Sequence, residues 1–93
     1  MEVTPIYELR YSEKAFEDIA YFKRLGDTAI IRKINRLLDE LEQHPAIGTG
    51  QVEALKHNLA GFWSRRINQE HRLLYSINNE SGIVYIYSLK GHY

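Results

Sequence analysis

The order of apolar and polar residues divides the chain into strand-like segments at both ends and helix-like segments between them. Near the start, Tyr7, Leu9 and Tyr11 alternate with charged residues, which is the two-residue period of a half-buried strand over residues 6–11. The next two stretches have the 3.6-residue spacing of helices instead. After residue 62 the strand period returns, so the pattern predicts the order β-α-α-β-β-β.

The first predicted helix covers residues 13–24. Ser12 precedes it as an N-cap residue, and Gly26 follows it as a residue suited to the left-handed conformation at a helix end. Helical spacing predicts a narrow apolar face, made of Phe16, Ile19, Ala20 and Lys23.

The second helix has the clearest amphipathic pattern in the chain. Asp27 is its predicted N-cap, and His44-Pro45 closes it. Because only two residues separate the helices, we expect them to form an antiparallel hairpin. A basic side could face nucleic acid, but we favour a solvated face with helix-spaced ion pairs. The apolar stripe consists of Ile30, Ile34, Leu37, Leu38 and Leu41.

Three further strands are predicted over residues 62–67, 72–77 and 83–89. Polar segments separate them, which is typical of two hairpins. A loop with two glycines, residues 47–50, connects the second helix to this region. The predicted fold class is therefore α+β, a small antiparallel-rich four-stranded sheet backed by a two-helix hairpin, in one domain over residues 1–93.

The first of these hairpins has two plausible registers. One pairs Ile67 with Arg72, and the other pairs Arg66 with Arg72. We favour the second because it separates apolar from cationic side chains more cleanly, although it places Arg65 on the apolar side. Two arginines side by side repel each other unless an anion lies between them, so this register indicates a phosphate site.

Composition excludes several classes of protein. The 93 residues contain no cysteine, so disulfides and thiolate metal sites are excluded, and the net charge is zero. A neutral chain is not expected to bind nucleic acid strongly without help from a larger partner. No signal peptide or membrane-spanning run is visible, which predicts a soluble, cytoplasmic protein without a membrane partner.

Positive charge gathers in one stretch, residues 53–72. Guanidinium groups there match phosphate oxygens in pairs of hydrogen bonds. Cleavage of RNA by its own 2′-OH needs a base, a cation near the phosphate and an acid for the 5′-oxygen. The residues supply candidates for each role: Glu53 as base, Arg66 and Arg72 with Arg65 and Lys56 as cations, His92 as acid and Tyr93 as its stacking or hydrogen-bonding neighbour.

The residues by themselves leave a simpler interpretation open, a small α+β domain with a phosphate-binding patch. Lys56 would lie about one turn from Glu53 only if that segment were helical. The four histidines lack the spacing of metal ligands, so no metal or other cofactor is expected.

The central stretch also resembles a known family. It reads Glu-x-Leu-Lys-x-Asn-Leu-x-Gly-Phe-Trp-Ser-Arg-Arg-Ile-x-x-Glu-His-Arg-Leu-x-Tyr over residues 53–75, and the chain ends in Gly-His-Tyr. Both features are similar to the YoeB/Txe toxins of bacterial toxin–antitoxin modules, within the RelE/ParE superfamily. The resemblance implies a ribosome-dependent mRNA endonuclease that cuts in the ribosomal A site. It also implies as partners the ribosome, mRNA and a cognate YefM- or Axe-like antitoxin, with a homodimer or a toxin–antitoxin hetero-oligomer as the assembly.

The resemblance assigns roles to individual residues. It implies that Glu53 is the general base, that Arg72 and Arg66 clamp the phosphate, and that the C-terminal His92 is the acid. It also implies that Lys56 is a second cation and Tyr93 a helper. Two alternatives are a ParE-like toxin that binds gyrase without cleaving RNA, and a non-catalytic interaction module of the same fold. A pure binder needs no acid–base set, so the combination of these residues favours the nuclease.

Overall fold

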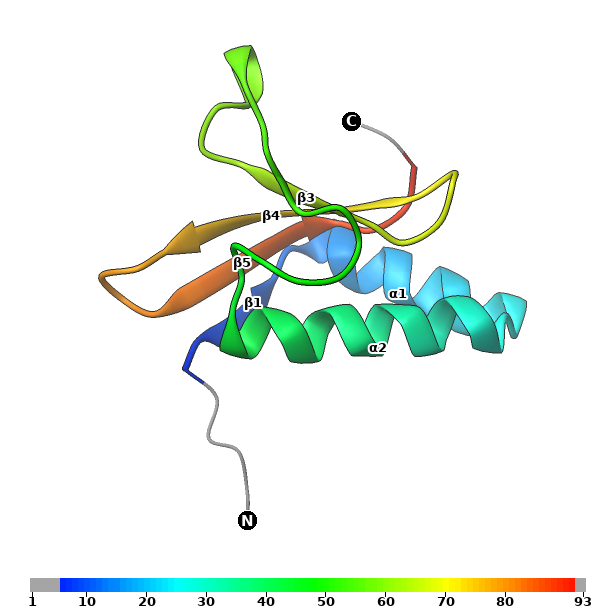
Figure 1. Cartoon of the computed structure of the whole chain (residues 1–93). Coiled ribbons are helices and arrows are strands. Elements are labelled where there is room, and N and C mark those ends of the chain that lie inside the picture. Colours follow the sequence, from blue (N-terminus) through cyan, green and yellow to red (C-terminus); the bar gives the residue numbers. More distant parts are fainter. Residues whose placement is uncertain (1–5, 92–93) are drawn as a thin grey trace.

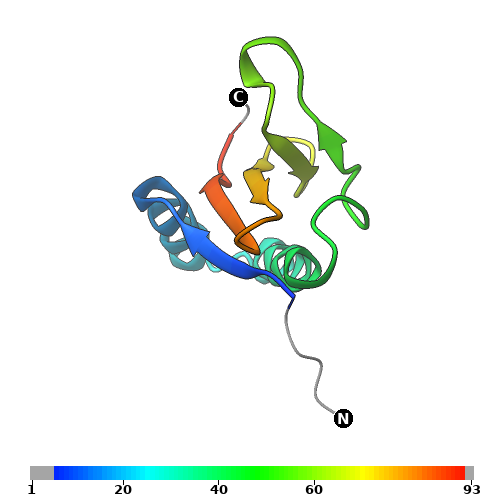
Figure 2. The same ribbon diagram turned by 90° about the vertical axis from the view of Figure 1, so that its left-hand side faces the viewer.

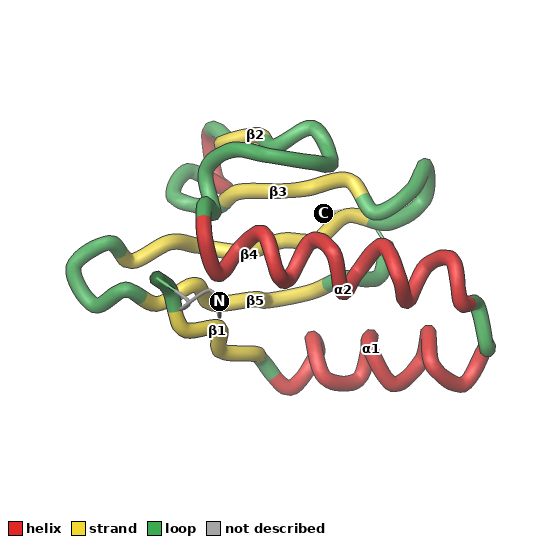
Figure 3. Tube along the Cα trace, turned by 60° about the horizontal axis from the view of Figure 1, so that its bottom comes forward, coloured by secondary structure: helices red, strands yellow, loops and turns green. Residues whose placement is uncertain are grey.

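The computed structural model describes residues 6–91 and consists of a twisted five-stranded sheet with both helices on one face (Figure 3). The opposite face of the sheet carries no helix, and the segment between α2 and β3 rises beside it (Figures 1 and 2). The strand order is β1-β5-β4-β3-β2. The elements are β1 (Glu8–Tyr11), α1 (Glu13–Leu25), α2 (Thr28–Gln43), β2 (Glu53–Ala54), the 3₁₀ turn η1 (His57–Leu59), β3 (Trp63–Arg66), β4 (Arg72–Asn78) and β5 (Ile83–Ser88).

The predicted helix caps are confirmed. The Ser12 side chain accepts a hydrogen bond from the backbone N–H of Ala15 at 3.0 Å, and the Asp27 side chain accepts one from Ile30 at 3.1 Å. The predicted stripe of α2 faces the core, with its central residues fully buried. None of the helices described is both long and apolar enough to cross a membrane. The stripe residues in the core are Ile34, Leu37 and Leu41, with Ile30 and Leu38 packed against them.

The predicted apolar face of α1 is wrong by one position. Ala15 and Phe22 are buried, whereas Phe16 is 60% exposed. The error arises because Asp18, a carboxylate, occupies the middle of the buried face. A polar residue at that position hides the true stripe from a hydrophobic pattern. Of the predicted face, Ala20 and Lys23 are also exposed and Ile19 is half-buried.

The sheet has one strand more than the four predicted. β2 is only two residues long and has no apolar alternation, so its sequence carries no strand signal. It pairs antiparallel with β3 and forms one edge of the sheet. β1 forms the other edge and runs parallel to β5, because the helical hairpin returns the chain to the start of the sheet.

The register of β3 and β4 is the predicted one. Arg66 pairs with Arg72, and Arg65 pairs with Leu73. Because strand side chains alternate between faces, Arg65 enters the core beneath the sheet with Leu73, which is fully buried.

Arg65 is completely buried, and its guanidinium is held by five oxygen atoms. It donates to Glu40 Oε1 at 3.0 Å and to the Tyr75 hydroxyl at 3.2 Å. The expectation that Arg65 binds RNA phosphate is therefore wrong, because a guanidinium without exposed surface cannot reach a phosphate. Its remaining partners are the carbonyl oxygens of His44 at 2.9 Å, Ile47 at 2.6 Å and Thr49 at 3.4 Å.

This arginine fixes the loop between α2 and β2. Burial alone would raise the pKa of Glu40, but hydrogen bonds from Thr49 and the charge and hydrogen bond of Arg65 outweigh it and lower that pKa. The backbone N–H of Arg66 donates a hydrogen bond to the Gly50 carbonyl at 2.5 Å, and a side chain at Gly50 would collide with the backbone of β3. The loop thus lies directly against β3, which is the strand that carries the next arginine.

Arg65→Met should lower the free energy of unfolding by about 3–5 kcal/mol, because it removes one partner of a buried ion pair and leaves the loop carbonyls unpaired. Arg66→Met is the matched control on the neighbouring residue and should change stability by less than about 1 kcal/mol. Urea denaturation of both variants measures the difference. Equal destabilisation by the two substitutions would contradict the role given to Arg65.

Candidate active site

Three of the predicted site residues, Glu53, Arg66 and Arg72, lie on the helix-free face of the sheet. Glu53 is opposite Ser64 in the β2–β3 pairing, and Arg66 is opposite Arg72 in the β3–β4 pairing. Paired residues of antiparallel strands project to the same side, and Ser64 and Arg66 are two residues apart. Glu53, Arg66 and Arg72 therefore share one face, opposite to the face that Arg65 enters.

The two arginines form a cation pair suited to an anion. The side chain of Arg72 donates from Nη1 to the carbonyl of Asn68 at 3.0 Å, which orients it along the hairpin. Arg66 Nε is buried and has no hydrogen-bond partner within residues 6–91. A buried donor without an acceptor is costly, and so is a register that sets two like charges directly opposite each other. A phosphate oxygen would relieve both.

Glu53 lies on an extended segment with a constrained backbone. Its side chain is exposed, and the chain on either side takes left-handed angles at Gln51 (φ 53°) and His57 (φ 58°), which are uncommon for residues other than glycine. Lys56 is extended as well, with φ −124° and ψ 176°. The helical turn that would place Lys56 over Glu53 is therefore absent, and Lys56 is an exposed cation just before η1.

Gly91, the last described residue, comes to the same place. The backbone N–H of Arg72 donates to the Gly91 carbonyl at 3.1 Å, and the N–H of Gly91 donates to His71 Nδ1 at 2.8 Å. His92 and Tyr93, the predicted acid and its helper, lie outside the described residues. Gly91, which directly precedes the predicted acid His92, is thus hydrogen-bonded to Arg72.

An aromatic row on the same face of the sheet, farther along the strands from the arginines, was not predicted from the sequence. The ring of Tyr87 meets Phe62 edge-on at 5.0 Å between centroids and lies 4.8 Å from Tyr85. The Tyr87 hydroxyl is 3.2 Å from Ser76 Oγ. The alternation of Tyr85 and Tyr87 with buried Val84 and Ile86 was the available signal. Tyr85 is exposed, and Phe62 and Tyr87 are half-buried. Aromatic rings on the same face as cations are suited to stacking on unpaired bases.

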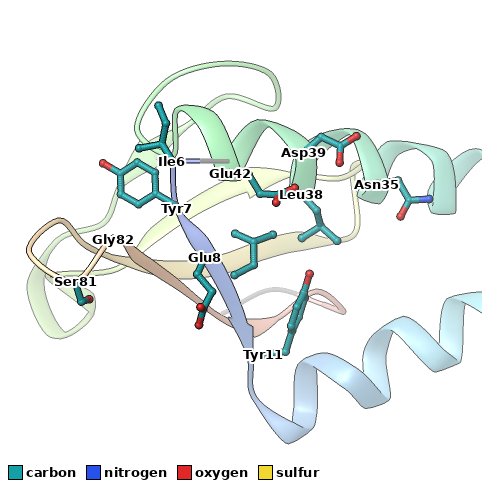
Figure 4. Close-up of a pocket in the computed structure, with 11 residues that line it drawn as sticks. Ile6, Tyr7, Glu8, Tyr11, Asn35, Leu38, Asp39, Glu42, Ser81 and Gly82 are labelled. Carbon is teal, nitrogen blue, oxygen red and sulfur yellow. The ribbon is translucent and has the colours of Figure 1, made fainter. Parts of the chain in front are cut away.

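A pocket with a volume of about 910 Å³ lies elsewhere, between β1 and α2 (Figure 4). Glu8, Asp39 and Glu42 line it, and burial followed by the charge of Glu42 raises the pKa of Tyr11 there. A negatively charged lining repels phosphate, so the size of this pocket does not make it the site. Within residues 6–91, no group of three His, Cys, Asp or Glu side chains is arranged to hold a metal ion.

Comparison with known sequences gives a consistent result. The model of one protein family, described as the YoeB-like toxin of bacterial type II toxin–antitoxin systems, matches residues 11–93. Toxin YoeB of Escherichia coli K12 is 43% identical over 77 residues, which cover 83% of this chain and 90% of that toxin.

Solved structures agree with the sequence comparison. The YoeB dimer from Staphylococcus aureus superposes with a TM-score of 0.81 at 42% identity, covering 95% of this chain and 99% of that one. The heterotetrameric YoeB–YefM toxin–antitoxin complex from the same species gives a TM-score of 0.80 at 42% identity, covering 94% and 98% of the two chains.

Proposed function

Because this chain belongs to the family of YoeB-like toxins of bacterial type II toxin–antitoxin systems, we propose that it acts as an endoribonuclease that cuts mRNA on the ribosome. The observation that carries the proposal is the shared face of the sheet. A carboxylate and two paired arginines lie on it, and Gly91, the last described residue, is hydrogen-bonded to one of these arginines. These are the groups that a metal-independent cleavage of RNA requires.

The proposed reaction begins with Glu53, which takes the proton from a 2′-OH. The freed oxygen attacks the adjacent phosphorus and forms a 2′,3′-cyclic phosphate, while the bond to the 5′-oxygen of the next nucleotide breaks. His92 gives that oxygen its proton. Arg66 and Arg72 stabilise the extra negative charge that develops on the phosphate oxygens in the transition state. The unpaired Arg66 Nε supports this assignment, because the donor is in place before the charge develops.

The ribosome is proposed to supply the affinity for RNA and the substrate orientation that a neutral chain lacks. With twelve basic and twelve acidic residues, the protein gains little affinity from counterion release on free RNA. A ribosome that already holds the message in a bent, unpaired form removes that requirement and orients the scissile bond. The aromatic row of Phe62, Tyr85 and Tyr87 is available to stack on the exposed bases.

Purified protein should cut mRNA in the A site of programmed ribosomes, and the cut should persist in excess EDTA once ribosome integrity has been verified. On the same RNA without ribosomes the rate should fall by at least about 10²-fold, because substrate orientation is lost. Primer extension locates and quantifies the cuts. Inhibition of gyrase supercoiling without any RNA cleavage would instead support a ParE-like function.

Substitutions on the open face should separate chemistry from folding. Glu53→Gln should slow single-turnover cleavage by about 10²–10⁴-fold, because the amide cannot accept the proton. Arg72→Ala should slow it by about 10²–10³-fold through loss of charge stabilisation. Matched controls are Glu80→Gln, an exposed carboxylate in the turn between β4 and β5, and Arg32→Ala, an exposed arginine on α2. A wild-type rate for Glu53→Gln would exclude Glu53 as the base.

The relative from S. aureus assembles with YefM, and another of its structures is a dimer. We propose that this chain likewise pairs with an antitoxin, whose acidic segment covers the helix-free face. Arg66 and Arg72 are the cations open to such a segment, because Arg65 is buried.

Co-expression of the antitoxin should restore growth and yield a complex whose mass by light scattering exceeds that of the toxin. Arg66→Glu with Arg72→Glu should weaken the complex at least about 10-fold, because like charges replace opposite ones. Binding of the doubly substituted toxin at wild-type affinity would place the antitoxin on another surface.

A further inference from the structure

The last described residues are held by a buried carboxylate of α1. Asp18 Oδ2 accepts hydrogen bonds from the backbone N–H groups of Leu89 at 2.9 Å and Lys90 at 3.0 Å. The ammonium of Lys90 also lies 3.8 Å from the centre of the Tyr21 ring, on the same helix. Two successive N–H groups beyond β5 are thus bound by one side chain that is distant in sequence.

The next residue, Gly91, is held by residues at the start of β4. Both backbone groups of Gly91 are paired, its N–H with His71 Nδ1 at 2.8 Å and its carbonyl with the N–H of Arg72 at 3.1 Å. The ring of His71 is itself fixed, since it meets Phe22 edge-on with 5.0 Å between centroids. Nδ1 acts as the acceptor here, so it carries no proton in this arrangement.

The position of Asp18 is not explained by helix packing alone. Asp18 is only 5% exposed, and an apolar residue would fill the same place without the cost of burying a charge. Burial raises the pKa of Asp18, but the N–H of Leu89, the Lys14 ammonium and the N–H of Lys90 together lower it below the ordinary value. The buried carboxylate therefore serves to attach the segment that follows β5, through the N–H groups of Leu89 and Lys90.

We infer that Asp18 and His71 are positioning residues, which fix Leu89–Gly91 so that Gly91 is held beside Arg72. The inference rests on the proposed nuclease activity, in which His92 is the acid. A chain terminus frays unless it is tied down, and a misplacement of about 1 Å can cost 10²-fold in rate. Neither residue is assigned a contact with RNA, so both act through the position of the residues that follow Gly91.

Paired substitutions at His71 separate the acceptor from the ring. His71→Phe keeps the aromatic contact with Phe22 and removes the acceptor, whereas His71→Asn keeps an acceptor near the place of Nδ1 and removes the ring. We expect His71→Phe to lower kcat on ribosome-bound mRNA by about 10–10²-fold with KM unchanged. His71→Asn should stay within about 5-fold of wild type. The reverse order would overturn the inference, because it would show that only packing matters.

A double-mutant cycle with the chain end tests whether the effect passes through residues 92–93. In a chain that lacks His92 and Tyr93, His71→Phe should cause no further loss of rate. An equal additional loss in the truncated chain would overturn the inference. Asp18→Leu and Asp18→Asn repeat the comparison from α1, and Asn should retain more activity because its oxygen still accepts the two N–H groups. The two Asp18 variants replace the His71 variants in this test if His71→Phe does not fold.

Hydrogen exchange of the free protein tests the attachment without any cleavage assay. The amide of Gly91 should exchange at least about 10-fold faster in His71→Phe than in wild type, and His71→Asn should protect it. Unchanged protection in both variants would overturn the inference, whatever the activity. Absence of cleavage by the wild-type protein would instead overturn the proposed function, and the exchange result would still decide whether His71 holds the chain end.

Discussion

The buried ion pair between Arg65 and Glu40 is the interaction on which the rest of the structure depends. It joins α2 to β3, and through the carbonyls of residues 44–49 it draws the connecting loop against the sheet. A charge removed from water is stable only when its donors are all matched, and this guanidinium meets five oxygens. The pair therefore fixes the position of β3 relative to the helices, and with it the strand face that carries the site.

The site is a direct consequence of that arrangement. Because strand residues alternate between faces, burying Arg65 places Arg66 on the other side, in register with Arg72. One arginine stabilises the interior and its neighbour is left with an unpaired donor. Buried polar groups are normally hydrogen-bonded, as in Arg65. An exception at the neighbouring residue, Arg66, is typical of a functional surface.

A second buried charge, Asp18, has a corresponding role at the end of the chain. Arg65 holds the loop that leads into β2 and Glu53, whereas Asp18 and His71 hold the segment that leads out of β5. The two segments that carry the proposed catalytic residues are thus attached to the same helical layer. No predicted site residue lines the acidic pocket of about 910 Å³ between β1 and α2, so the candidate site is proposed from charge and strand pairing and not from the volume of a pocket.

Sequence alone determined the features that depend on near neighbours. Caps at Ser12 and Asp27, the stripe of α2 and the pairing of Arg66 with Arg72 follow from periods of 3.6 and 2.0 residues, which a short window contains. Tertiary structure decided the buried face of α1, the short strand β2, the burial of Arg65 and the hold on Gly91. Each depends on a partner far along the chain, 25 residues from Arg65 to Glu40 and 71 from Asp18 to Leu89. The periodicity of a short segment contains no information about such a distant partner. A charged residue is therefore predicted to be exposed unless its partner of opposite charge is known.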